Sequence, residues 1–254
     1  MRTKKILVIL ISIFFVACTI LLCGFMLSVR KVDVHYNVAD DTDVSKIQQV
    51  FNGYESKNLL FLDEDEVKNC LKNFPYFEIS SVEKQFPNVL KINVTQRRET
   101  YQLVTDEKIY LLTETGLVLS ETEEKRESRD IISLEFKDIL IEDTTYGKPI
   151  KTSADDLVYT TFSMAQSVNL TDCIKNILVI DQPEREDVVI STYSGVDIVI
   201  IKALQKGKEK VQEAFSAYDN IENDYLKLSK NIEVVWGEQQ NKPIVTWTDK
   251  SFTE

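Results

Sequence analysis

The sequence is poor in the residues from which most metal centres and many acid–base catalytic sites are built. Its 254 residues include 1 His and 4 Cys, which leaves few ligands for zinc or haem. The formal net charge of -11 disfavours contact with phosphate backbones, so nucleic acid is excluded as a partner class. With 43% hydrophobic and 28% charged residues the composition is globular. We expect no catalytic residues, no metal and no cofactor.

Acidic residues are absent from the first part of the chain. Residues 1–31 contain five bases and no acid, and residues 6–27 form a run of 22 residues without charge. A helix of that length measures about 33 Å, enough to cross a bilayer core. The sequence therefore predicts a cytoplasmic tail (1–5), a single transmembrane helix (6–27) and an extracytoplasmic remainder, because a basic N-terminus stays in the cytoplasm.

The cysteines leave two alternatives open. Phe-Val-Ala-Cys at 15–18 loosely resembles a lipid-attachment signal, which would make Cys18 a lipidated N-terminus. Nine uncharged residues follow Cys18, and this length favours an uncleaved anchor. Cys70 and Cys173 are compatible with a disulfide in an oxidising compartment and equally with two buried thiols.

Residues 29–98 show the pattern of a small domain with the order strand, helix, helix, strand, strand. Residues 29–36 alternate as a strand does, whereas Val44, Ile47 and Phe51 follow helical spacing. Together with the elements that follow, this order predicts a three-stranded sheet covered by two helices.

The second helix of this domain has its own start and stop signals. Asp63 is the expected N-cap, with Glu66 three residues on, and Pro75 is the expected end of the helix. Residues 79–86 and 89–94 then alternate as a hairpin.

Residues 99–248 predict a larger, mainly antiparallel β domain with flanking helices, followed by a short tail at 249–254. Charged residues at 121–130 predict a solvated loop. The predicted strands are 101–105, 109–112, 117–119, 131–136, 177–180, 188–193, 196–201, 232–236 and 244–247. The predicted helices are 208–218 and 153–167, the latter with Leu157, Tyr159, Phe162 and Ala165 facing inward. Four lysines at the start of the helix at 208–218 are expected in solvent: Lys202, Lys206, Lys208 and Lys210.

Several short segments, in order along the chain, carry a family resemblance. They are 58–63 (Asn-Leu-Leu-Phe-Leu-Asp), 74–76 (Phe-Pro-Tyr), 86–90 (Phe-Pro-Asn-Val-Leu), 92–99, 110–118 and 232–236 (Ile-Glu-Val-Val-Trp). With the basic tail and apolar run before them, they resemble the FtsQ/DivIB family of bacterial cell-division proteins, and residues 29–98 resemble a POTRA domain. Thr113 and Val235 depart from the family pattern, which has an aspartate and a basic residue there.

The resemblance implies an α+β scaffold without enzymatic activity, in the cell membrane at the division septum. Such proteins hold FtsL-like and FtsB/DivIC-like partners, with a septal penicillin-binding protein as a further partner, and help control septal peptidoglycan synthesis. The alternative from a different class is a POTRA-containing, membrane- or lipid-anchored surface protein that serves as a chaperone or transporter accessory.

The resemblance places partner binding on the last two strands. An edge strand there could receive a partner peptide by β-augmentation. The candidate residues are Ile232, Glu233, Val234, Val235, Trp236, Ile244, Val245 and Trp247. Trp236 and Trp247 could anchor a partner or pack in the core, and both roles have equal weight at this point.

Overall fold

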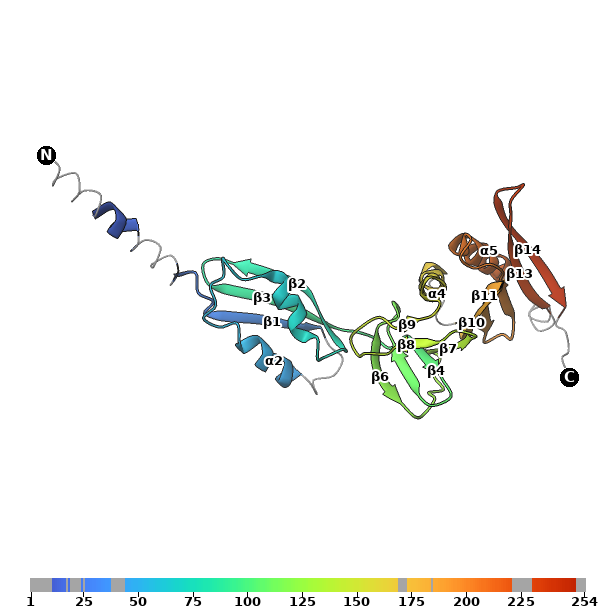
Figure 1. Cartoon of the computed structure of the whole chain (residues 1–254), viewed down its shortest axis with the longest axis horizontal. Coiled ribbons are helices and arrows are strands. Elements are labelled where there is room, and N and C mark those ends of the chain that lie inside the picture. The colour runs from blue at the N-terminus through green and yellow to red at the C-terminus, as the bar shows by residue number, and fades with distance from the viewer. Residues whose placement is uncertain are drawn as a thin grey trace. The chain divides into compact units, whose positions relative to one another are not determined.

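The computed structural model describes residues 11–16, 18, 24, 26–37, 44–168, 173–183, 185–220 and 230–249. The chain divides into two compact units, the N-terminal unit (residues 1–97) and the C-terminal unit (residues 98–254). Figure 1 shows both units.

The predicted tail at 1–5, most of the predicted span at 6–27 and residues 250–254 lie outside the described residues. Within the described ranges, no helix combines the length and the apolar character that crossing a bilayer requires.

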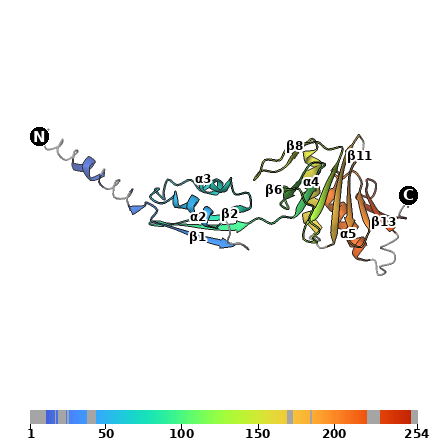
Figure 2. The same ribbon diagram turned by 90° about the horizontal axis from the view of Figure 1, so that it is seen from below.

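The N-terminal unit has the predicted order of strand, helix, helix, strand, strand. Its elements are β1 (Lys31–Asn37), α2 (Val44–Asn52), α3 (Glu64–Lys68) with the 3-10 turn η1 (Asn69–Leu71), β2 (Phe77–Gln85) and β3 (Val89–Gln96). β3 lies in the middle of the sheet, parallel to β1 and antiparallel to β2. Both helices lie on one face of the sheet (Figure 2).

The core of this unit follows from the alternation of residues on β3 and the helical spacing of residues on α2. Leu90 and Ile92 alternate inward on β3, and Ile47 and Phe51 lie one turn apart on α2; all four are fully buried. Leu59, in the segment between the helices, is fully buried with them.

Of the two local predictions for α3, the start is confirmed and the end is wrong. The Asp63 carboxylate caps the helix by accepting from the backbone N–H of Asp65 (2.9 Å). The helical segment ends at Leu71, four residues before Pro75, and its last turn is a 3-10 helix, as is common at helix ends.

The C-terminal unit is built on one nine-stranded mixed sheet with the order β14-β13-β12-β11-β10-β7-β4-β5-β6. The strands are β4 (Tyr101–Val104), β5 (Ile109–Leu112), β6 (Val118–Thr122), β7 (Ile132–Lys137), β10 (Ile174–Gln182), β11 (Arg185–Thr192), β12 (Asp197–Ile200), β13 (Lys230–Gly237) and β14 (Lys242–Asp249). A separate two-stranded sheet consists of β8 (Ile141–Asp143) and β9 (Lys151–Thr152).

Two helices cover one face of the large sheet, α4 (Asp155–Val168) and α5 (Gly207–Asp219) (Figure 2). Parallel neighbours need a crossover connection, and each helix supplies one. α4 lies in the connection between the parallel pair β7 and β10, and α5 in the connection between β12 and β13. A third parallel pair joins β4 and β7, and the other pairs of the sheet are antiparallel. The sheet is thus antiparallel in most of its pairs, as predicted.

The prediction that Tyr159 faces inward is wrong. Tyr159 on α4 is 37% exposed, and its hydroxyl donates to the Ile150 carbonyl (2.9 Å) instead of packing inward. The prediction of a solvated segment at 121–130 agrees with the structure: none of these side chains is buried, although the first two residues belong to β6. The buried Gln102 also binds both backbone groups of Arg126, at 2.8 and 2.9 Å.

Substitution of Leu59 tests the core of the N-terminal unit. Leu59→Ala should lower the free energy of unfolding of this unit by about 3 kcal/mol, because it leaves a cavity where no solvent enters. Hydrogen exchange of the amides of β1, β2 and β3 measures this loss. The matched control is Leu60→Ala, since Leu60 is 54% exposed. Equal exchange in both variants would contradict the assigned core.

Candidate functional site

The large sheet ends at β14. This strand pairs with β13 in antiparallel register, from Lys230 opposite Asp249 to Gly237 opposite Lys242. Within the described residues, β13 is the only strand paired with β14 (Figure 1). Alternate N–H and C=O groups on the outer side of an edge strand have no ladder partner and can pair with an incoming strand.

The opposite edge of the sheet, β6, is partly closed. The Val118 N–H donates to the Lys148 carbonyl (2.9 Å), and the Val118 carbonyl accepts from the Gly147 N–H (2.8 Å). β6 is also short, with five residues against eight in β14. Of the two edges, β14 therefore offers the longer run of backbone for pairing.

Both ends of β14 carry residues that limit pairing. Lys242 is exposed at the first position, and Pro243 has no backbone N–H to donate. At the far end Asp249 forms an ion pair with Lys230 (Nζ–Oδ1 2.7 Å). Charge and proline on an edge restrict indiscriminate strand pairing. Residues 244–248 remain as the segment suited to an incoming strand.

The eight predicted partner-binding residues all lie on the ribbon formed by β13 and β14, but they differ in burial. The fully buried ones are Ile232 and Val234; the partly buried ones are Glu233, Val235, Trp236 and Val245. Ile244 and Trp247 are the most exposed, at 37% and 36%. A partner could touch these two directly, whereas Ile232 and Val234 hold the ribbon to the core.

The two exposed residues lie on opposite faces of the ribbon. Trp247 is opposite the buried Ile232, and Ile244 is opposite Val235. Because neighbouring residues of a strand alternate in direction, Trp247 lies on the face covered by α5 and Ile244 on the other face. Each face of the ribbon therefore presents an apolar side chain beside the edge of the sheet.

A buried lysine fixes α5 against the sheet. Lys210 is 0% exposed, and its Nζ donates to the carbonyls of Ile201 (2.7 Å) and Lys202 (3.0 Å). The prediction that this side chain is solvated is therefore wrong. The reason is the helical spacing. Position 210 lies one turn before the buried Ala214, so its side chain lies on the buried face of α5.

Asp187 on β11 completes this Lys210 anchor. Asp187 is 2% exposed, and its carboxylate accepts from the backbone N–H of Lys202 (2.9 Å) and from Arg185 Nε (2.6 Å). Burial lowers the pKa of the Lys210 ammonium, and the Asp187 carboxylate opposes that shift. The anchor joins β11, the turn after β12 and α5, which in turn covers the ribbon. Sequence analysis missed Asp187, which carries no motif.

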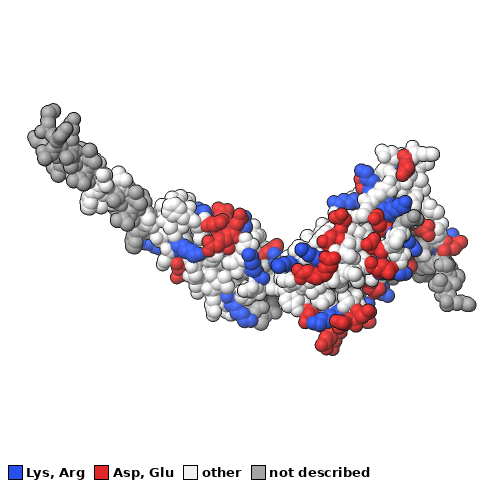
Figure 3. All heavy atoms as spheres, in the orientation of Figure 1, with Lys and Arg blue, Asp and Glu red and all other residues white. Residues whose placement is uncertain are grey.

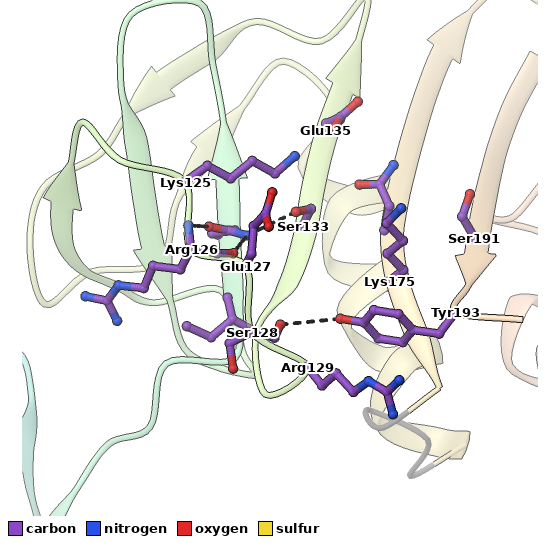
Figure 4. Close-up of a pocket in the computed structure, with 13 residues that line it drawn as sticks. Lys125, Arg126, Glu127, Ser128, Arg129, Ser133, Glu135, Lys175, Ser191 and Tyr193 are labelled. Atoms are coloured by element: carbon purple, nitrogen blue, oxygen red, sulfur yellow. Dashed lines mark hydrogen bonds between the residues drawn. The ribbon is translucent and has the colours of Figure 1, made fainter. Parts of the chain in front are cut away.

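The open face of the sheet also holds a polar pocket with a volume of about 620 Å³. Figure 4 shows it between the loop at 125–129 and strands β10 and β11. The Tyr193 hydroxyl closes one side by donating to the Ser128 carbonyl (3.3 Å). Its charged lining residues are Lys125, Arg126, Arg129, Lys175, Glu127 and Glu135. Because both signs of charge line the wall, the pocket suits polar ligands without selecting one class.

The side chains that could bind a metal ion or take part in catalysis do not belong to these sites. Within the described residues, no group of three His, Cys, Asp or Glu is placed to hold a metal ion. His35 is an exposed side chain on β1, with Nε2 3.8 Å from Asp33 Oδ2. Cys70 and Cys173 are partly buried, one in each unit.

Comparison with known proteins agrees with the resemblance drawn from the motifs. Residues 27–97 match the family described as "POTRA domain, FtsQ-type". The curated "Cell division protein DivIB" of Clostridium tetani (strain Massachusetts / E88) is 22% identical over 207 residues, 76% of each chain. The solved extracytoplasmic domain of DivIB from Geobacillus stearothermophilus matches 50% of this chain and 98% of its own, with 13% identity and a TM-score of 0.33. The resemblance to the FtsQ/DivIB family is confirmed.

Removal of the buried ammonium tests the Lys210 anchor. Lys210→Met should lower the free energy of unfolding of the C-terminal unit by about 2–4 kcal/mol, because two buried carbonyls lose their donor and the buried Asp187 carboxylate loses a nearby positive charge. Urea unfolding followed by the fluorescence of Trp236 and Trp247 measures the change. The control is Lys208→Met, which replaces an exposed lysine of the same helix and should act within about 0.5 kcal/mol. Equal losses in the two variants would refute the anchor.

Proposed function

We propose that this protein is a membrane-anchored scaffold of bacterial cell division, which captures FtsL-like and FtsB/DivIC-like partners by pairing one of their strands with β14. The single observation that carries this proposal is the position of β14 at the edge of the nine-stranded sheet. Through the partners that it holds, the scaffold helps to control septal peptidoglycan synthesis. A septal penicillin-binding protein joins the same assembly.

Backbone pairing supplies the affinity in this mechanism. An added strand over residues 244–248 satisfies outward amides and carbonyls of β14 that otherwise bond to water. The pairing requires an extended partner segment, because only a strand matches the repeat of the edge groups. This chemistry asks for no proton transfer or nucleophile, which supports a scaffold in preference to an enzyme.

Side chains supply selectivity in this mechanism. Alternate residues of the added strand would meet Ile244 and Thr246 on the open face and Val245 and Trp247 on the face covered by α5. A large aromatic side chain at the margin of an interface can bury much apolar area, so Trp247 is the expected anchor. A partner strand with apolar residues on both faces fits this pattern.

The apolar run at 6–27 supports a membrane anchor, with the N-terminus in the cytoplasm and both units outside it at the septum. The alternative function, a chaperone or transporter accessory, would also have a POTRA domain and a surface location. These two features therefore do not distinguish it from the division scaffold. The cell-division relative favours the division role over a chaperone or transporter accessory.

A charge at the proposed anchor tests partner capture. Trp247→Glu should weaken binding of a peptide from the DivIC-like partner at least tenfold, about 1.4 kcal/mol or more, because it places a carboxylate in the apolar contact. Isothermal titration of the peptide into the purified protein measures the loss. Gln240→Glu adds the same charge in the exposed turn before β14 and should change the affinity less than twofold.

Folding is checked on the same samples by circular dichroism and urea unfolding. Lost binding with an unchanged unfolding midpoint supports the docking role of Trp247. If Trp247→Glu unfolds the C-terminal unit in parallel with the lost binding, the residue is part of the core and the proposed anchor fails.

A further inference from the structure

Large apolar side chains are exposed at one end of the N-terminal unit. Phe61 is 82% exposed, Phe86 58% and Leu60 54%. Figure 3 shows uncharged surface at the end of this unit from which the N-terminal segment leaves, with charged side chains beside it. A cluster of exposed phenylalanine and leucine marks an interaction surface.

Hydrogen bonds bring the parts of this apolar end together. Phe86 follows the last residue of β2, in the turn that leads to β3. Lys84, near the end of β2, donates from Nζ to the Leu62 carbonyl (2.7 Å). The segment that contains Leu60 and Phe61 therefore lies at the same end of the sheet as the turn at Phe86.

The end of the apolar run is fastened to this surface. The Leu59 N–H donates to the Leu27 carbonyl (2.7 Å), and the Asn58 side chain donates to the Gly24 carbonyl (3.3 Å). Gly24 and Leu27 are the last part of the run at 6–27. Phe61 follows Leu59 by two residues, a reach of about 7 Å along an extended chain.

We propose that Leu60, Phe61 and Phe86 insert into the interfacial layer of the extracytoplasmic leaflet and seat the N-terminal unit on the lipid bilayer. This inference rests on the membrane anchor in the proposed function. If residues 6–27 span the bilayer, the bonds to Gly24 and Leu27 hold the apolar end at the level of the lipid headgroups. Phenylalanine and leucine side chains on interfacial surfaces bury at the boundary between headgroups and acyl chains.

The charged side chains beside this apolar surface indicate whether lipid binding depends on headgroup charge or on apolar insertion. Each lysine there has an acidic neighbour: Lys57 Nζ lies 2.7 Å from Glu66, Lys84 Nζ 3.9 Å from Glu64 and Lys31 Nζ 3.3 Å from Asp33. Paired charges give little net attraction to anionic headgroups. The seat therefore depends on apolar insertion, and zwitterionic lipid is enough to form it.

An environment-sensitive dye locates the surface. The full chain, with its four native cysteines replaced by alanine, carries Leu60→Cys labelled with a nitrobenzoxadiazole dye in phosphatidylcholine vesicles. We expect at least threefold brighter emission at position 60 than at Asn73→Cys, and strong quenching by lipids with a nitroxide near the headgroup. Asn73 is exposed before the start of β2, at the opposite end of the strand from Phe86.

A second variant separates insertion from the dye's own affinity for lipid. Phe61→Glu with Phe86→Glu changes two exposed positions, so the unit stays folded, and it should reduce the emission at position 60 to that at 73. Adding phosphatidylglycerol to the vesicles should change the wild-type signal less than twofold.

Extraction of the vesicles at alkaline pH tests, independently of the dye, whether the chain is anchored in the bilayer. A chain that resists extraction but shows equal emission at 60 and 73 overturns the seat and leaves the anchor standing. A chain that is extracted overturns the anchor and the seat together. A signal that appears only with phosphatidylglycerol overturns the apolar mechanism.

Discussion

Backbone amides that leave water must find another hydrogen-bond partner, and the two margins of the nine-stranded sheet meet this requirement differently. At β6 the backbone of Val118 is bonded to the chain at 147–148. At β14 the described part of the chain supplies partners from β13 on one side only. Water satisfies the outer groups of β14 while they are exposed. A protein that covers them must offer matching groups at the same spacing, so the edge selects an extended segment.

Such an edge can select a partner only if it keeps its position. Ile232 and Val234 fix β13 in the core, and α5 covers the ribbon. α5 is in turn set by Lys210, whose ammonium needs the two carbonyls of the turn before the helix. Burying the Lys210 charge carries a desolvation cost, which the two carbonyls offset only where α5 now lies. Every other placement of the helix is disfavoured, since it would leave that charge without partners. The Lys210 anchor thus determines where the covered face of β14 lies.

The sequence predicts those elements whose buried face alternates strictly. The strands at 89–94, 196–201 and 232–236 were found close to their predicted bounds, because one face of each packs on a core. The strand order and the parallel pairs could not be predicted from the sequence. They depend on how the connections, among them α4 and α5, cross the sheet. Lys210 was predicted to be solvated because lysine is usually a surface residue. Its spacing from the buried Ala214, by contrast, indicates the inward face of the helix. The edge position of β14 is a property of the whole sheet, and periodicity along one strand cannot reveal it.

The two surfaces proposed for interaction rest on different physics. Insertion of Phe61 and Phe86 into lipid is non-directional: it depends on apolar area and tolerates any headgroup that does not repel it. Pairing with β14 is directional, because each hydrogen bond requires a donor and an acceptor in register. A bilayer has no fixed pattern of groups and could not satisfy a strand edge, whereas a partner strand could cover an apolar cluster but gains no specificity there. The chain places its exposed phenylalanines beside the end of the apolar run and the edge strand β14 in the other unit, which matches each surface to the kind of partner that it can recognise.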